Sequence, residues 1–115
     1  MPLGDPAGKV AVITGAASGI GRAMVEHASA LGMRVAAVDM VEERLADLAA
    51  DDVTIHGVDV ADAAAVDALA AAVYGRWGAV HLLFNNAGVF QAGLAWHRSL
   101  DDWKWALDVN LWGII

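Results

Sequence analysis

Residues 14–21 read Thr-Gly-Ala-Ala-Ser-Gly-Ile-Gly, and this stretch decides the fold. It stands between a β-branched apolar run and a stretch with helical periodicity, so it predicts a turn from a strand into a helix. Such a turn presents backbone N–H groups and the positive end of the helix, which together can hold a pyrophosphate. Gly15 allows the tight turn, Gly19 lets a diphosphate approach the backbone, and Gly21 leaves room where helix meets strand. Because a turn can need glycines for its shape alone, the surrounding elements have to support this interpretation.

Strand-like and helix-like stretches alternate on both sides of this turn. Residues 9–13 read KVAVI, typical of a buried parallel strand, and residues 19–31 carry apolar side chains at helical spacing before Gly32. The same patterns predict strands at 34–38, 53–57 and 80–84, and helices over 41–50, after the N-cap candidate Asp62, and from a capping box at Ser99 and Asp102 onward without an end before Ile115. The predicted fold class is therefore α/β: a Rossmann-type, doubly wound parallel sheet of about four strands in the order 3-2-1-4, with helices on both faces.

Length and composition limit the classes of function. The 115 residues have room for one domain, which we place at 9–115, with residues 1–8 as a flexible lead-in. The net charge of -7 and the scattered Lys and Arg residues argue against nucleic-acid and membrane-surface binding. The absence of cysteine excludes a disulfide framework and fits a reducing compartment, so we expect a cytoplasmic protein. The four histidines have no ligand spacing, and no metal site is predicted.

Asp39 indicates which dinucleotide the turn could hold. It follows the second predicted strand, where a carboxylate can accept hydrogen bonds from the ribose of an adenosine. It could also cap the next helix with Glu42 at the third position, and the two roles can coexist. A carboxylate repels a 2′-phosphate, and the neighbouring Ser18 and Met40 supply no cation, so NAD is favoured over NADP. Arg22 could reach a phosphate, although an exposed helical arginine is the simpler interpretation.

The sequence of motifs resembles the short-chain dehydrogenase/reductase family. The motifs are TGxxxGIG, Asp39, the pair Asp59-Val60 after the third strand, Asn85-Asn86-Ala87-Gly88 after the fourth, and Asn110 in the last helix. They occur in the family's order, and the resemblance covers Lys9 to Ile115. It implies a homo-oligomeric parent enzyme that transfers hydride reversibly between NAD and a secondary alcohol or ketone.

The resemblance also implies roles for single residues. Asp59 would accept from the adenine amino group beside the Val60 backbone, although an acidic residue can simply begin a loop. Ile20 would pack beside the nicotinamide. The other residues implied to line the cofactor are Thr14, Gly15, Ser18, Gly19 and Gly21 in the first turn, Asp39, and Asn86, Ala87 and Gly88 on the ribose side, where a plain turn is the alternative.

Asn110 is the one implied catalytic residue. In the family this asparagine helps to hold a water linked to a catalytic lysine. Trp103, Leu107 and Ile114 place Asn110 on the apolar face of its helix, so its amide is expected to find a buried partner, which in the simpler interpretation is backbone.

The match lacks the remaining catalytic residues. Family members carry a serine and a Tyr-x-x-x-Lys, in which the tyrosine is the general acid or base and the lysine lowers its pKa. Here the single tyrosine, Tyr74, is followed four positions later by Gly78, and no lysine follows Lys104. We therefore expect the cofactor-binding half of an oxidoreductase, truncated before the catalytic segment and inactive alone.

Two other functions fit parts of the pattern. The chain could be a non-catalytic dinucleotide-binding or interaction module, which would bind NAD when purified alone. It could also be a methyltransferase-like domain that binds S-adenosylmethionine, since that fold also places an acid at the end of its second strand. The GxxxGxG spacing and Asn85-Asn86-Ala87-Gly88 argue against the methyltransferase.

Overall fold

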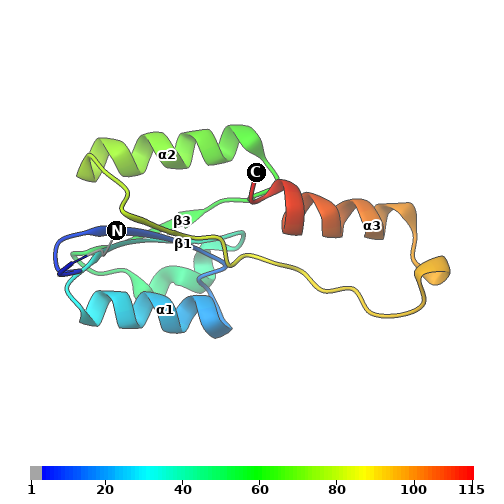
Figure 1. Ribbon diagram of the computed structural model, residues 1–115, viewed down its shortest axis with the longest axis horizontal. Helices are drawn as coiled ribbons and strands as arrows, with labels where there is room; N and C mark the ends of the chain where they lie inside the picture. The colour runs from blue at the N-terminus through cyan, green and yellow to red at the C-terminus, as the bar shows by residue number, and fades with distance from the viewer. Residues whose placement is uncertain (1–3) are drawn as a thin grey trace.

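A computed structural model describes residues 4–115, so the first three residues of the predicted lead-in lie outside the described residues. The elements alternate as the sequence predicts, and Figure 1 labels the main ones. Their bounds are β1 Val10–Thr14, α1 Gly19–Ala30, β2 Arg34–Asp39, the 3-10 helix η1 Glu42–Leu48, β3 Val53–Gly57, α2 Ala63–Trp77, β4 Leu82–Phe84, the 3-10 turn η2 Ala95–His97, α3 Leu100–Leu107 and the π-helical turn η3 Asp108–Trp112.

The four strands form one parallel sheet in the order β3-β2-β1-β4, which confirms the predicted fold class, a partial Rossmann fold. Every residue of β1 is buried because this strand has a neighbour on each side and helices on both faces. Figure 1 shows α1 on one face of the sheet and α2 on the other. The carboxyl ends of all four strands therefore meet at one edge.

The core is divided by the sheet into two apolar clusters, because successive strand residues point to opposite faces. Ala11 and Ile13 of β1 belong to the cluster that includes Val25 of α1. Val10 and Val12 belong to the cluster that includes Val73 of α2. The alternation along β1 thus fixes which helix covers which face.

The α3 segment extends away from this body. Figure 1 shows α3 and the connection before it beyond the carboxyl-terminal edge of the sheet, which gives principal extents of 48 × 34 × 26 Å. Its large apolar side chains are exposed, with Phe90 at 86% and Leu100 at 87%. Within residues 4–115, no helix combines the length and the apolar character needed to cross a bilayer.

Helix ends follow the sequence closely at three places. Gly32 has a φ of +78°, as expected just after α1. The Asp62 carboxylate accepts the N–H of Ala65 at the start of α2. The capping box is confirmed in both directions, since the Ser99 hydroxyl accepts from the N–H of Asp102 at 3.0 Å and the Asp102 carboxylate accepts from the N–H of Ser99 at 3.2 Å.

Two predicted elements differ in type or length. The helix predicted over 41–50 is the 3-10 helix η1, in which the two buried side chains, Leu45 and Leu48, stand three residues apart and match the three-residue period. The strand predicted over 80–84 begins only at Leu82. At position 81 a side chain takes part in the pairing, because the N–H of Val10 donates to the imidazole of His81, while the backbone N–H of His81 still donates to the carbonyl of Val10.

The helix expected to continue past Ile115 is a wrong prediction. The chain leaves the α-helix after Leu107 and makes the π-helical turn η3, which ends at Trp112. The N–H of Gly113 donates to the carbonyl of Asp108, five residues back. A Cβ at Gly113 would lie 2.7 Å from the Val60 side chain, so the close packing there favours glycine.

Candidate functional site

The Thr14 hydroxyl joins the carboxyl ends of β1 and β4. It donates to the carbonyl of Phe84 at 3.3 Å and accepts from the N–H groups of Asn86 and Ala87 at 3.1 and 2.9 Å. The Asn86 amide donates in turn to the carbonyls of Thr14 and Gly15 at 3.1 and 3.4 Å. The turn after β4 is thereby fixed against the glycine-rich turn after β1.

The glycine-rich turn is shaped by close backbone contacts. Gly15 has a φ of +66°, and a Cβ there would lie 2.9 Å from the Asn86 amide nitrogen. A Cβ at Gly21 would lie 2.1 Å from the carbonyl oxygen of Gly15, so α1 reaches the end of β1 only because this residue has no side chain. A Cβ at Gly19, by contrast, would meet nothing within 4 Å. Gly19 therefore faces open space at the start of α1.

The amino-terminal end of α1 is open to an anion. Its N-cap, Ser18, makes no side-chain capping bond, and no acidic residue occupies the first turn. The first N–H groups of any α-helix lack acceptors within the helix, and the helix dipole adds partial positive charge there. The described residues thus leave donors at the position where the sequence predicts a pyrophosphate.

Asp39, at the end of β2, faces this turn. One carboxylate oxygen accepts the N–H of Ala17 at 3.1 Å, and the other accepts the N–H of Val41 at 3.3 Å. The predicted capping role is corrected in one respect, because the N-cap position of η1 is Val41 and not Asp39, and it makes no side-chain capping bond. Each carboxylate oxygen has more than one acceptor position, so Asp39 can still accept from a ligand.

A small hollow of about 130 Å³ lies at this edge of the sheet; we call it the Asp39 hollow. It brings together residues from the ends of all four strands. Its predicted members are Gly15, Asp39, Asp59, Val60, Ala87 and Gly88, and its further members are Val38, Met40, Val58, Val89 and Val109. No sequence signal singles out the second group apart from their positions next to motif residues.

Other predicted residues lie outside the Asp39 hollow. The residues that do not line it are Thr14 at the end of β1, Ser18, Gly19 and Gly21 at the start of α1, and Asn86 after β4. Ile20 is 73% exposed and lines a larger apolar groove of about 640 Å³ between α1 and β4. A dinucleotide exceeds the Asp39 hollow in size, so most of it would lie on the open surface over α1.

Asp59 and Arg22 have partners of their own. Asp59 accepts the N–H of Ala61 at 2.9 Å with one oxygen, which leaves the other available. Arg22 is bonded to Asp47 and lies 3.4 Å from Glu26. The hydrogen bond between Arg22 and Asp47 raises the pKa of Arg22 and lowers the pKa of Asp47. Arg22 is therefore directed toward η1, and its side chain is only 29% exposed, so the expectation of an exposed helical arginine is wrong in this respect.

Asn110 holds the chain that follows the Asn85–Gly88 turn. Its amide oxygen accepts the N–H of Val89 and its amide nitrogen donates to the carbonyl of Val89, both at 2.8 Å. Backbone is thus its partner, but the expected burial is wrong, because Asn110 is exposed while its neighbour Val109 is the buried residue of η3. The π-helical turn that carries it has no signal in the sequence.

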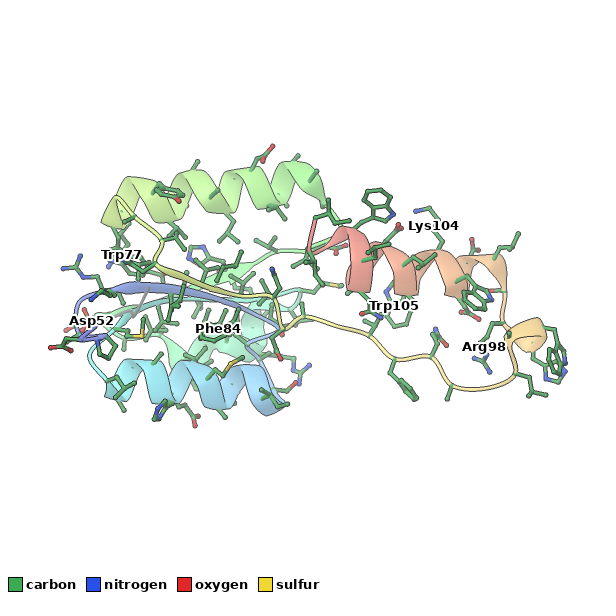
Figure 2. The ribbon with its side chains drawn as sticks, viewed as in Figure 1. Asp52, Trp77, Phe84, Arg98, Lys104 and Trp105 are labelled. Atoms are coloured by element: carbon green, nitrogen blue, oxygen red, sulfur yellow. The ribbon has the colours of Figure 1, made fainter. Side chains whose placement is uncertain are left out.

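A second hollow, of about 310 Å³, adjoins Asn110 and includes Gln91, Arg98 and Trp103. Val89 lines both hollows, so it separates Asn110 from the Asp39 hollow. Figure 2 shows Arg98 near the far end of this segment, beside the start of α3. Across residues 4–115, no cluster of three or more His, Asp or Glu side chains could hold a metal ion.

Comparison with known proteins matches residues 9–115 to the family described as short chain dehydrogenase. A relative from Mycolicibacterium smegmatis, D-threitol dehydrogenase, is 46% identical over 112 residues, which are 92% of this chain and 43% of that enzyme. A short chain dehydrogenase/reductase from Burkholderia phymatum, solved in complex with NAD, matches with a TM-score of 0.91 and 45% identity over 96% of this chain and 41% of its own. A metagenomic short-chain oxidoreductase, solved with NADP, matches with a TM-score of 0.86 and 32% identity; the match covers 93% of this chain and 52% of that protein. The chain therefore spans less than half the length of the first two.

Proposed function

The chain belongs to the short-chain dehydrogenase family, and from that premise we propose that it binds NAD as the dinucleotide-binding part of an oxidoreductase. The proposed reaction is reversible hydride transfer between NAD and a secondary alcohol or ketone. The observation that carries this proposal is the open start of α1 beside Asp39, where helix donors and a ribose acceptor face the same edge of the sheet.

The diphosphate would lie over Ser18, Gly19 and the first N–H groups of α1. The open space at Gly19 allows a phosphate to reach the backbone without meeting a side chain. The Ser18 hydroxyl is not used as a cap and can donate to a phosphate oxygen. The close backbone contacts of Gly15 and Gly21 hold the turn in this shape before a ligand binds.

The two ends of the dinucleotide would diverge from there. In the Asp39 hollow, the ribose hydroxyls would donate to Asp39 and the adenine amino group to the free oxygen of Asp59, next to the Val60 backbone. Ala87, whose N–H is held by Thr14, and Gly88 would form the floor below the ribose. On the other side of the turn, Ile20 would pack against the nicotinamide, which supplies the hydride when bound.

NAD is proposed over NADP on electrostatic grounds. A 2′-phosphate would meet the Asp39 carboxylate, and phosphate recognition normally uses an arginine or lysine. Arg22, the cation in the first turn of α1, is already bonded to Asp47 and faces Glu26. Relatives in complex with either cofactor are known, so the preference rests on these residues alone.

Catalysis by the chain alone is not proposed. Asn110 would position a water through its remaining amide capacity, but its described bonds go to the Val89 backbone. The chain has no Tyr-x-x-x-Lys, so no described group can exchange the alcohol proton as the family does. We propose residues 9–115 as one NAD-binding domain of a cytoplasmic, homo-oligomeric enzyme whose substrate is a small alcohol or ketone.

Calorimetric titration of the chain with NAD, NADP and S-adenosylmethionine tests the proposal. We expect binding of NAD, weaker binding of NADP and none of S-adenosylmethionine. Gly19→Ala should weaken NAD binding by at least about tenfold because its methyl group occupies the phosphate approach. Gly78→Ala is the matched control, since Gly78 also has a positive φ and open space but lies at the far end of α2. Equal NAD binding by both variants, or a preference for S-adenosylmethionine, contradicts the proposal.

A further inference from the structure

The two ends of β4 are both joined to β1 through side chains. β4 has three residues and β1 is its one strand neighbour in the described sheet. At the carboxyl end, the Thr14 hydroxyl bonds the backbone around Asn86. At the amino end, the N–H of Val10 donates to Nδ1 of His81 at 2.9 Å, and the N–H of His81 donates to the carbonyl of Val10 at 2.9 Å.

The bond from Val10 requires one protonation state of the imidazole. An imidazole nitrogen can accept a hydrogen bond only when it carries no proton, so His81 must be neutral with its hydrogen on Nε2. The doubly protonated ring has N–H groups on both nitrogens, and Nδ1 would then oppose another donor. His81 is exposed, so solvent protons reach its ring, whereas Val10 is 1% exposed and its N–H has no access to replacement water.

We propose that His81 is an acid-sensitive latch that fixes β4 to β1 when neutral and releases the amino end of β4 when protonated. The release would act on a strand with few other bonds, which also carries the Asn86 turn at its other end. If NAD binds where we propose, protonation of His81 also loosens that side of the site; this last consequence rests on the proposed function.

The neighbouring Lys, Arg and Asp side chains do not change their charge in the pH range in which a histidine is protonated. Figure 2 shows Asp52 and Trp77 at the end of the sheet opposite α3, which is the end where His81 lies in the strand register. Lysine and arginine keep their charge, and aspartate in water stays ionised, throughout the range in which histidine titrates. Among residues 4–115, the charged groups at this end are Asp5 and Lys9 before β1, Arg34 at the start of β2, Asp51 and Asp52 before β3, and Arg76 in the last turn of α2. His27, in the last turn of α1, is a second histidine at this end, and it is present in every protein compared in the test, so its protonation affects them alike.

The test compares the full chain with His81→Asn, whose Oδ1 stands where Nδ1 does and accepts at every pH. Thermal unfolding at about pH 7.5 should give similar Tm values, and at about pH 5.5 the Tm of the histidine form should fall about 4–8 °C below that of the variant, as expected for one lost hydrogen bond. His81→Leu, which offers no acceptor to the Val10 N–H, should have a lower Tm than His81→Asn at both pH values. Because these readouts need no ligand, they stand apart from the outcome of NAD binding.

Two local measurements complete the test. Long-range ¹H–¹⁵N spectra at neutral pH should show the Nε2–H tautomer of His81, and the Val10 amide should exchange faster at acid pH in the histidine form than in His81→Asn at the same pH. An Nδ1–H tautomer, or equal Tm losses on acidification in both proteins, overturns the proposal.

Discussion

The carboxylate of Asp39, at the end of β2, accepts a hydrogen bond of 3.1 Å from the backbone N–H of Ala17, inside the glycine-rich turn that follows β1. One side chain thus links two neighbouring strand ends at the edge where the Asp39 hollow opens. The turn is held in place before a ligand is present, so binding has less conformational entropy to lose.

Asp39→Asn tests the charge at this position. The variant keeps one carbonyl oxygen but loses the negative charge and one of the two acceptor oxygens. We expect NAD to bind about tenfold more weakly, because a charge-assisted hydrogen bond to the ribose becomes a neutral one. The affinity for NADP should rise relative to the affinity for NAD, since the repulsion of the 2′-phosphate disappears. Calorimetry with both cofactors measures the ratio, and an unchanged ratio contradicts the assignment of Asp39.

Gly21→Ala tests the close approach of α1 to β1. Its methyl group would lie 2.1 Å from the carbonyl oxygen of Gly15, so the helix has to move. We expect a loss of about 1–3 kcal/mol in the free energy of unfolding. Gly75→Ala, in the last turn of α2 with open space at its Cβ, should instead raise the free energy of unfolding by up to about 1 kcal/mol. Denaturant unfolding compares the two; a stable Gly21→Ala would show that the contact is not tight.

Thr14→Val and Thr14→Ser separate the hydroxyl from the methyl group of Thr14. Valine leaves the N–H groups of Asn86 and Ala87 without their acceptor, which should cost about 1–3 kcal/mol for each group that water cannot reach. Serine keeps the acceptor and should retain most of the stability. If the two variants unfold alike, the hydroxyl is not what joins β1 to β4.

His56, in β3, should make the fold less stable in acid. Burial lowers the pKa of His56, and the nearby Glu42 opposes this only in part. The folded state therefore binds its proton less readily than the unfolded state. The resulting stability is present above the unfolded pKa of histidine and is lost as pH falls toward the lowered folded pKa. His56→Asn should flatten this part of the profile of unfolding free energy against pH; a profile of unchanged slope would contradict the effect.

The sequence predicted most of the fold because its signals are local. The strand at 53–57 lies where its β-branched pattern places it, and the sheet order follows from the crossover rule. The steric need for Gly21 was also readable, since no other residue type fits where a helix meets a strand end so closely.

What the sequence could not predict depends on contacts between distant residues. The pairing of His81 with Val10 shortens β4, and nothing in the run VHLLF signals it. The π-helical turn at Asn110 arises where Gly113 packs on Val60, far away in sequence. Asn110 is exposed while its neighbour Val109 is the buried residue of η3, which helix periodicity does not describe.

The proposed function requires that the start of α1 and Asp39 together bind NAD. The most direct test is a ¹H–¹⁵N correlation spectrum of the chain titrated with NAD, with every backbone amide assigned. We expect the largest shifts on Ser18, Gly19 and Ile20 and on the amides of Ala17 and Val41, which donate to Asp39. Shifts confined to α3, or a folded chain whose spectrum does not change at millimolar NAD, would contradict it.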